Sequence, residues 1–357
     1  MRVVHVDSAA SWRGGQNQVL LTARAMAAQG HEVVLACRRG GALDARAREA
    51  GLDVRAIPFR GDLWPAAAWG LARVLREVAP RVVQLHDPHA LSAGLLARGL
   101  GPRVPLVATR RVDFRLAGAL SRAKYRAAAR VVAVSGAIAD VLEQDGIARS
   151  AIRVVYEGVP DRAPAPGGRE ALRALGIPDG ALVVGNVAAL TDHKDHRTLL
   201  DAAARVVRLR PDARFVVVGD GELRAPLEAQ ARALGLGDRC VFAGFRRDLD
   251  VLLPAFDVFC LSSHMEGLGT IVLDAMAFAR PVVATAAGGI AESVADGVTG
   301  RLVAPRDEIA LAQALLEVLG DPARAAAFGR AGRRRFEERF SADRMVEETL
   351  AVYKELM

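Results

Sequence analysis

A short segment in the second half of the chain combines two carboxylates with a glycine-rich turn. Residues 262–277 read SSHMEGLGTIVLDAMA, in which Glu266 ends an apparent strand, Gly267-Leu268-Gly269 forms a tight loop, and Asp274 lies one turn into the following helix. Glycines let backbone N–H groups approach a ligand, and the N-terminus of a helix starting near Thr270 carries partial positive charge. The segment therefore predicts a phosphate site. Because carboxylates only accept hydrogen bonds and repel phosphate, Glu266 and Asp274 are expected to bind hydroxyl groups attached to that phosphate.

Asp274 by itself has a second explanation, since the helix TIVLDAMAFA is apolar and an exposed aspartate on its face needs no ligand. Lys194 is more unusual. Three of the 48 basic side chains are lysines, namely Lys124, Lys194 and Lys354, so arginine fills nearly every routine basic position. A compact ammonium contacts one phosphate oxygen as a point charge, unlike the fork of arginine. Lys194 is thus a candidate phosphate ligand, with an ordinary surface position in a polar loop as the alternative.

Length and composition define the class of protein. A chain of 357 residues is long enough for about two domains. With 52% apolar and 25% charged residues the composition is globular, and no stretch approaches the roughly 20 apolar residues of a membrane span. Aromatic residues make up 5% and are not interleaved with basic residues, which argues against nucleic acid as a partner. The net charge of +7 is compatible with phosphorylated ligands or an anionic membrane surface.

The N-terminus and the cysteines bear on location. The first residues, MRVVHVDSAA, enter a strand-like run without the apolar segment of a signal peptide, so we expect a cytoplasmic protein. Its basic surface allows peripheral contact with the inner face of the cell membrane. Cys37, Cys240 and Cys260 lie far apart in apolar runs and are expected to be buried, without a disulfide or a zinc site.

Strand-like and helical patterns alternate along the chain, which predicts βαβ units around parallel sheets. The strand-like runs fall at 2–6, 32–37, 52–57, 81–86, 105–109, 130–135 and 152–156, and then at 182–188, 214–219, 240–244, 258–263, 281–285 and 300–303. Between the two series lies VPDRAPAPGGREA, which resembles a linker. Ligands of parallel sheets bind at the carboxyl ends of strands, so the expected site is a cleft between two facing domains.

Several segments, taken in order, resemble the retaining GT-B glycosyltransferases of family 4. They are Gly14-Gly15, SGAIADVL from Ser135, IRVVYEGVP from Ile152, ALTDHKDHRTLLDAA around Lys194, VVVGDGEL from Val216, the Glu266 to Asp274 element, and GGIAESVADGVTGRLV from Gly288. The element matches the E-x7-E pattern of the family, with Asp as its second carboxylate. The resemblance implies two Rossmann-like parallel-sheet domains facing a cleft, with the C-terminal helix crossing back to the first domain. Residues 1–163 are then the acceptor-binding domain, 164–338 the donor-binding domain and 339–357 that helix.

The resemblance also implies roles for individual residues. Glu266 would contact hydroxyls of the transferred sugar, Asp274 the ribose, and Lys194 the leaving diphosphate. The implied donor site consists of Gly14, Gly15, Lys194, Gly267, Leu268, Gly269, Thr270 and Asp274. The family commonly has Gly-Arg-Leu a few residues before the lysine, whereas this chain has Ala188-Ala189-Leu190, so one cation is missing. His193, Arg246 and Arg111 are the candidates to replace it.

In the first half, Gly14 and Gly15 are expected in a polar loop before a helix beginning near Gln18. His86 and His89 follow a strand and are expected on the acceptor side, with at least one of them facing the ligand. Some relatives have a histidine near the reacting sugar where this chain has Arg111; a guanidinium cannot act as a base, but it can bind an anion. We therefore place Arg111, Glu266 and Lys194 in the catalytic set, with a surface arginine as the alternative for Arg111.

Neither histidine pair has a convincing third ligand, so no metal is expected in the site, and no cofactor beyond the nucleoside diphosphate sugar that serves as donor substrate. The predicted function is a retaining transfer of a hexose-like sugar to a hydroxyl acceptor, in the synthesis of cell-envelope glycans or glycolipids. The alternatives are a sugar-binding subunit with little or no turnover, a GT-B epimerase acting on sugar nucleotides, or a glycosyl phosphorylase. An NAD oxidoreductase is disfavoured, because no G-x-G-x-x-G opens either half.

Overall fold

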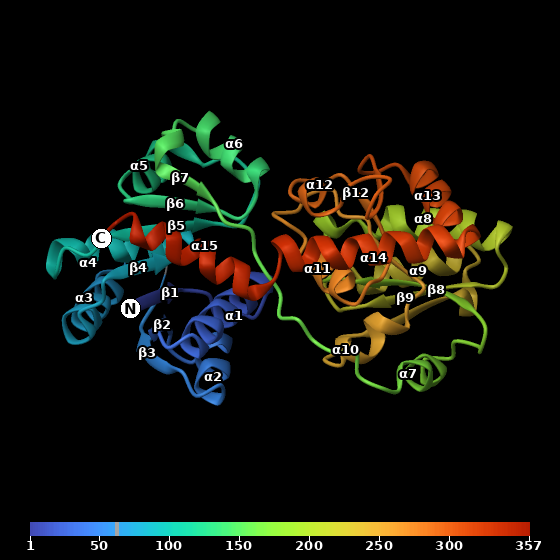
Figure 1. Ribbon diagram of the computed structural model, residues 1–357, viewed down its shortest axis with the longest axis horizontal. Coiled ribbons are helices and arrows are strands. Elements are labelled where there is room, and N and C mark those ends of the chain that lie inside the picture. Colours follow the sequence, from blue (N-terminus) through green and yellow to red (C-terminus); the bar gives the residue numbers. More distant parts are fainter. Residues whose placement is uncertain (61–63) are drawn as a thin grey trace. The chain divides into compact units, whose positions relative to one another are not determined.

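The computed structural model describes residues 1–60 and 64–357, and the chain divides into two compact units. Unit 1 comprises Met1–Pro160 and Ser341–Met357, and unit 2 comprises Asp161–Phe340 (Figure 1). Each unit is built around a parallel sheet with helices between successive strands. The two α/β halves that the sequence predicts are therefore present, and the chain returns to unit 1 for its final helix.

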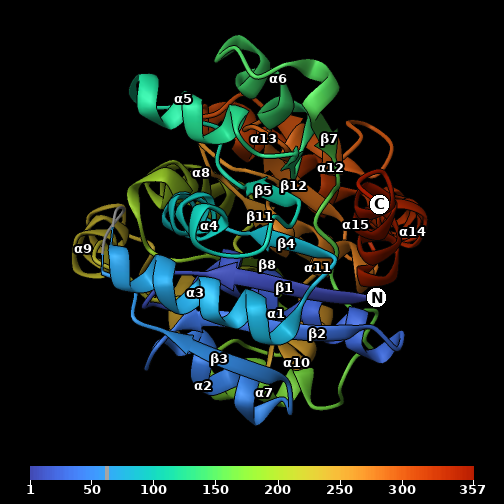
Figure 2. The ribbon, with the colours of Figure 1, turned by 90° about the vertical axis from the view of Figure 1, so that its left-hand side faces the viewer.

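The described part of unit 1 contains seven parallel strands in the order β3-β2-β1-β4-β5-β6-β7, and part of this order can be followed in Figure 2. The strands are β1 (Arg2–Asp7), β2 (Glu32–Arg38), β3 (Asp53–Ile57), β4 (Val82–Leu85), β5 (Leu106–Arg110), β6 (Arg130–Ala133) and β7 (Ile152–Val154). The helices are α1 (Gly14–Ala28), α2 (Ala42–Glu49), α3 (Pro65–Val78), α4 (Pro88–Leu100), α5 (Gly118–Arg126), α6 (Gly136–Gln144), η1 (Arg149–Ala151) and α15 (Ala342–Lys354).

The last helix, α15, completes the core of unit 1. Val346 and Tyr353 of this helix are fully buried in one cluster with Val19 of α1 and residues of the central strands. The Tyr353 hydroxyl donates to Gln84 Oε1 on β4. Without α15 this face of α1 and the sheet would be exposed, which explains why the chain crosses back.

Unit 2 contains six parallel strands in the order β10-β9-β8-β11-β12-β13. They are β8 (Leu182–Val187), β9 (Ala213–Val218), β10 (Cys240–Gly244), β11 (Val258–Leu261), β12 (Val282–Thr285) and β13 (Gly300–Val303). The helices are α7 (Gly168–Ala174), η2 (Asp192–Lys194), α8 (His196–Leu209), α9 (Arg224–Ala233), η3 (Gly237–Arg239), α10 (Leu249–Leu252), η4 (Leu253–Ala255), α11 (Thr270–Ala277), α12 (Ile290–Ser293), α13 (Glu308–Gly320) and α14 (Pro322–Arg339).

The strand order reverses once in each sheet, and this reversal locates a crevice. In unit 1 the direction changes between β1 and β4, and in unit 2 between β8 and β11. Loops on either side of such a point diverge to opposite faces of the sheet, which leaves room for a ligand at the carboxyl ends of the two strands. Gly14, Gly15 and His86 follow β1 and β4, while Lys194 and Glu266 follow β8 and β11.

No helix within residues 1–60 and 64–357 is long and apolar enough to cross a membrane. All three cysteines are buried as free thiols, as expected.

Strand β8, at the reversal in unit 2, has no room for a side chain at one position. A Cβ added to Gly185 would overlap the ring of Phe256, which is itself fully buried. The glycine thus allows the aromatic ring to lie directly on the strand that leads to the site.

We expect Gly185→Ala to destabilise unit 2 by about 1–3 kcal/mol, because the added methyl displaces the Phe256 ring in a close-packed core. In scanning calorimetry the transition of unit 2 should fall by about 3 °C or more. Gly320→Ala is the matched control, because its Cβ meets nothing within 4 Å. Equal melting temperatures for the two variants would contradict the packing described here.

Candidate active site

The loops that follow β8 and β11 are joined by hydrogen bonds. The His264 N–H donates to the carbonyl of His193 over 3.0 Å, and Ser262 Oγ donates to the carbonyl of Lys194 over 3.0 Å. Below them, Asn186 Nδ2 donates to the carbonyl of Cys260 over 2.9 Å. These bonds bring Lys194 and Glu266, which are 72 residues apart, into one place.

Lys194 and Glu266 form a close ion pair. The ammonium Nζ lies 2.8 Å from Glu266 Oε1 and 2.6 Å from Oε2, and the two side chains are 16% and 13% exposed. Glu266 does not end a strand as expected, because β11 stops at Leu261 and Glu266 lies in the following loop. That loop has to leave the sheet for Glu266 to reach across to the β8 side. The ammonium charge is thus held at the reversal by an acceptor that a ligand could displace.

The N-terminus of α11 adjoins this pair. Gly269 precedes the helix with φ 75°, a left-handed conformation that favours glycine, and no side chain caps the helix end. A Cβ on Gly269 would lie 3.3 Å from Cγ of Glu266 and 3.0 Å from Cγ1 of Ile290. The predicted turn is therefore present, with first-turn N–H groups and a helix dipole beside the Lys194 ammonium.

Asp274, in the second turn of α11, is paired with Arg162 from the segment that enters unit 2. Its side chain is 15% exposed. Burial raises the pKa of Asp274 to about 6, while the Arg162 guanidinium opposes the rise. The carboxylate is therefore ionised at neutral pH and already has a cationic partner.

In the loops after β8 and β11 no second fixed cation replaces the arginine that the family commonly has and that this chain lacks. Ala189 is exposed in the loop after β8. Arg246 is engaged by Asp248, with Nε and Nη2 at 2.9 and 2.6 Å from its oxygens. The pKa of His193 is lowered, chiefly by burial and then by Lys194, so this imidazole is mainly neutral at neutral pH. Within residues 188–195 and 262–269, Lys194 supplies the permanent positive charge.

In unit 1 the expected loop at Gly14 and Gly15 is wrong, because both residues lie in the first turn of α1. The preceding Arg13 is extended and gives no side-chain cap. A Cβ on Gly15 would lie 3.6 Å from Cδ of Arg111, so this helix end and Arg111 are neighbours.

Arg111 is fixed by two partners at the carboxyl edge of the sheet in unit 1. Its Nε donates to Glu157 Oε1 over 2.7 Å, and Nη1 donates to the His86 carbonyl over 3.2 Å. Nη2 lies 3.0 Å from His86 Nδ1. Because a guanidinium only donates, His86 Nδ1 must be the acceptor and Nε2 must carry the ring proton.

This assignment propagates to a second histidine. His86 Nε2 lies 2.8 Å from His5 Nδ1, so His86 donates and the proton of His5 is on its Nε2, a buried atom without a partner in the described structure. Burial and the nearby Arg111 charge lower the pKa of His5 to about 3 and that of His86 well below its ordinary value. Both rings are neutral, and hydrogen-bond donation runs from Arg111 through His86 to His5.

The two predicted acceptor-side histidines have different environments. His86 is 5% exposed and contacts His5 and Arg111, whereas His89 is exposed in the first turn of α4, its N–H donating to Asp87 Oδ1 over 2.9 Å. In the described residues no group of three or more His, Cys, Asp or Glu side chains is arranged to hold a metal ion.

Comparison with known proteins identifies the family. Residues 12–162 match the family model of Glycosyltransferase Family 4, and residues 169–335 match that of Glycosyl transferases group 1. A 2-deoxystreptamine glucosyltransferase of Streptomyces kanamyceticus is 32% identical over 85% of this chain and 78% of its own length. The chain belongs to the group 1, family 4 glycosyltransferases.

Two further relatives agree with this assignment. A 2-deoxystreptamine N-acetyl-D-glucosaminyltransferase of Streptomyces fradiae is 32% identical over 75% of this chain and 62% of its own length. The crystal structure of Anabaena HepE, described as a complex with UDP-glucose, has a TM-score of 0.86 at 23% identity and covers 99% of this chain and 100% of that one. The predicted GT-B fold is confirmed, and the protein is a glycosyltransferase.

Three residues of this glycosyltransferase's candidate site escaped the sequence reasoning. Glu157 lies inside the IRVVYEGVP motif, and a lone acid after a strand was the available signal. His5 is a polar residue between the valines of β1. Arg162 gave no signal, because its pairing with Asp274 spans 112 residues.

The neutral histidine pair makes unit 1 sensitive to acid. The folded protein holds the pKa of His5 near 3, against 6.5 for an exposed histidine, so the unfolded chain binds more protons between these pH values. Stability is therefore complete above pH 6.5 and is lost as the pH falls below it. His5→Asn removes this group while keeping an acceptor for His86.

Between pH 7 and pH 5 we expect the wild type to lose about 2 kcal/mol more stability than His5→Asn. All three tryptophans, Trp12, Trp64 and Trp69, belong to unit 1, so urea unfolding followed by tryptophan fluorescence reports this unit alone. The same loss of stability in both proteins would show that His5 is not held neutral.

Proposed function

We propose that this glycosyltransferase transfers a hexose-like sugar, with retention of anomeric configuration, from a nucleoside diphosphate sugar to a hydroxyl group. The observation that carries the proposal is the Lys194–Glu266 pair beside the N-terminus of α11. An ammonium, free helix N–H groups and a hydroxyl acceptor are the three components that a sugar diphosphate requires.

In the proposed complex the diphosphate takes the place of Glu266 as the partner of Lys194. Glu266 is then released to accept hydrogen bonds from sugar hydroxyls. The bond between the anomeric carbon and the diphosphate oxygen breaks, a bond to the acceptor oxygen forms on the same face, and the acceptor proton passes to the departing phosphate. Charge stabilisation and positioning supply the catalysis, so no covalent nucleophile is required.

The donor we propose is a uridine diphosphate hexose. Support comes from the glucosyltransferase relative and from the described complex of HepE with UDP-glucose. Asp274, ionised above about pH 6, is proposed to bind the ribose after exchanging or sharing its Arg162 partner.

For the acceptor we propose a hydroxyl group of a cell-envelope glycan or glycolipid, met by a cytoplasmic protein at the inner face of the membrane. The net charge of +7 supports this, since an anionic surface carrying lipid-linked acceptors would attract the protein. Within unit 1, Gly14 and Gly15 are proposed to contact the donor and His86 and His89 the acceptor, with Arg111 binding an anionic group while His86 holds it in position.

A binding subunit without turnover is the second candidate function. It is favoured by Ala189, which leaves the diphosphate with one fixed cation in these loops, and by the engagement of Arg246 with Asp248. The two candidates differ in whether sugar leaves the nucleotide.

The test combines binding with turnover. UDP and UDP-glucose should raise the melting temperature of the full chain, and release of UDP from UDP-glucose should depend on an added glycan or glycolipid acceptor. Lys194→Ala should lower turnover at saturating donor about 100-fold or more, since it removes the charge that stabilises the leaving group. Lys354→Ala, exposed on α15, should change nothing. Unchanged turnover in Lys194→Ala would contradict the proposed mechanism. A rise in melting temperature with UDP or UDP-glucose, but no turnover, would favour the binding subunit.

Substitutions of Glu266 and Asp274 should have different effects on UDP affinity and on turnover. We expect Glu266→Gln to lower turnover about 100-fold or more with at most about threefold change in UDP affinity, because its proposed contacts are with the sugar. Asp274→Ala should chiefly weaken UDP binding, by about tenfold, through loss of a charge-assisted hydrogen bond. Titration calorimetry with UDP and initial-rate measurements provide the two readouts. The reverse pattern would mean that the two roles are exchanged.

A further inference from the structure

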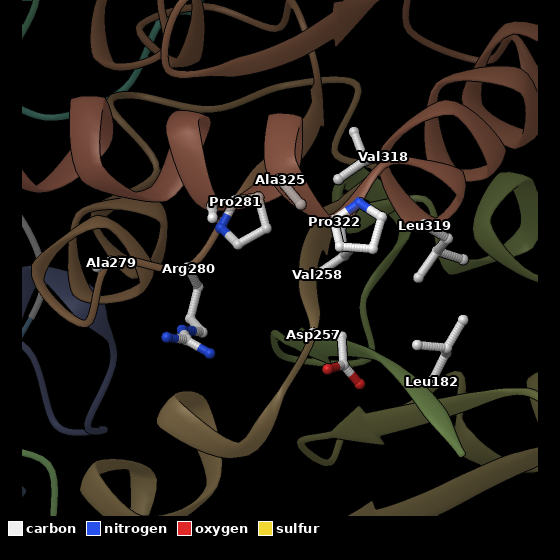
Figure 3. A pocket seen from close by; sticks show the side chains of 11 residues that line it. Leu182, Asp257, Val258, Ala279, Arg280, Pro281, Val318, Leu319, Pro322 and Ala325 are labelled. Carbon is white, nitrogen blue, oxygen red and sulfur yellow. The ribbon is translucent and has the colours of Figure 1, made fainter. Parts of the chain in front are cut away.

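A partly open cavity lies at the other edge of the sheet in unit 2. It has a volume of about 220 Å³ and is lined at the start of strands β8, β11 and β12 by Leu182, Val258 and Pro281 (Figure 3). The first turn of α14 and the end of α13 close it from the opposite side. Because Lys194 and Glu266 follow the carboxyl ends of β8 and β11, this cavity is separate from the candidate donor site.

Two opposite charges lie side by side in the cavity wall. Strands β11 and β12 pair with Phe259 opposite Val282, and Asp257 and Arg280 lie just before these strands, each two residues before a member of that pair. Figure 3 shows both side chains at the cavity.

Backbone hydrogen bonds hold these two side chains apart. Asp257 Oδ2 accepts from the Val183 N–H over 2.7 Å, on the β8 side. Arg280 Nε and Nη1 donate to the carbonyls of Phe278 and Phe256 over 3.1 and 3.3 Å. Within the described residues the two charges form no ion pair with each other, and neither Asp257 Oδ1 nor Arg280 Nη2 has a hydrogen-bond partner. Asp257 Oδ1 is therefore held in position to accept a hydrogen bond from a ligand, and Arg280 Nη2 is held in position to donate one.

The rest of the wall is apolar. Val318 and Leu319 from the end of α13, and Pro322 and Ala325 from α14, face Leu182 and Val258. A lone anion would meet the Asp257 carboxylate, and a lone cation would meet Arg280, so neither is favoured. A molecule that carries both charges and an apolar group satisfies every part of the wall.

We propose that this cavity is a binding site for a small zwitterion with an apolar side chain, of the class of the aliphatic α-amino acids. The ligand carboxylate binds Arg280 Nη2, its ammonium binds Asp257 Oδ1, and its side chain packs against Val318, Leu319 and Leu182. A guanidinium and a carboxylate presented on neighbouring strands match the two charged groups of an amino acid, which are attached to one carbon. This site does not rest on the proposed transferase function.

The site connects physically to the donor side through one helix. Ala279 and Arg280 follow the C-cap residue Phe278 of α11, and the backbone N–H of Arg280 donates to the carbonyl of Ala275 in that helix over 2.9 Å. The N-terminus of the same helix is the proposed phosphate site.

The experiment titrates L-leucine into the full chain and follows the ligand by NMR. We expect saturable binding with a Kd of about 1 mM or tighter. Three probes each lack one feature: 4-methylpentanoate lacks the ammonium, 3-methylbutan-1-amine lacks the carboxylate, and glycine lacks the apolar side chain. Each should bind at least about tenfold more weakly.

Matched variants locate the site. Ala325→Phe fills the cavity and should abolish leucine binding, whereas Ala323→Phe, an exposed position on the same turn of α14, should leave it unchanged. Asp257→Asn keeps an acceptor for Val183 but should bring leucine and 4-methylpentanoate to similar affinity. Thermal unfolding checks that each variant is folded.

The proposal is overturned by any of three results. They are the absence of saturable leucine binding to the wild type, equal affinity of the wild type for leucine and 4-methylpentanoate, and binding that survives in Ala325→Phe.

Discussion

The pairing of Lys194 with Glu266 is the interaction on which the candidate active site depends. An ammonium fixed near the reversal of the β8–β11 sheet needs a counter-charge, and Glu266 supplies it with both oxygens. The pair joins the two loops that the sheet topology sends to opposite faces. The β8 strand, with Gly185 under Phe256, and the left-handed Gly269 both support its geometry.

The site in unit 1 follows a different principle, because a permanent charge is balanced there by one carboxylate and oriented by neutral imidazoles. Arg111 is balanced by Glu157 and oriented by His86, whose tautomer is fixed by the guanidinium and passed on to His5. Burying two imidazoles is tolerable only when they are uncharged, which is why their pKa values are lowered. The free energy of unfolding of unit 1 therefore decreases below pH 6.5, because the unfolded chain binds protons that the folded unit does not bind.

Much of the fold could be predicted because its signals are local. Each of the 13 strands in residues 1–60 and 64–357 coincides with a strand-like run in the sequence, since strands buried on both faces of a parallel sheet are rich in apolar residues. The boundaries of short elements were less predictable. Gly14 and Gly15 begin α1, and Glu266 lies beyond β11, because helix starts and strand ends are decided by hydrogen bonds to distant segments.

The sequence by itself determined the family, the two α/β halves and the residue types at the candidate donor site. These depend on local spacing, which a linear pattern preserves. Only the tertiary structure decided that Lys194 is held by Glu266, that Asp274 is held by Arg162, and that Asp257 and Arg280 lie together at the other edge of the sheet. Such pairings join residues that are far apart along the chain. Two charges attract according to their distance in space, and that distance is defined only when strand order and register are set.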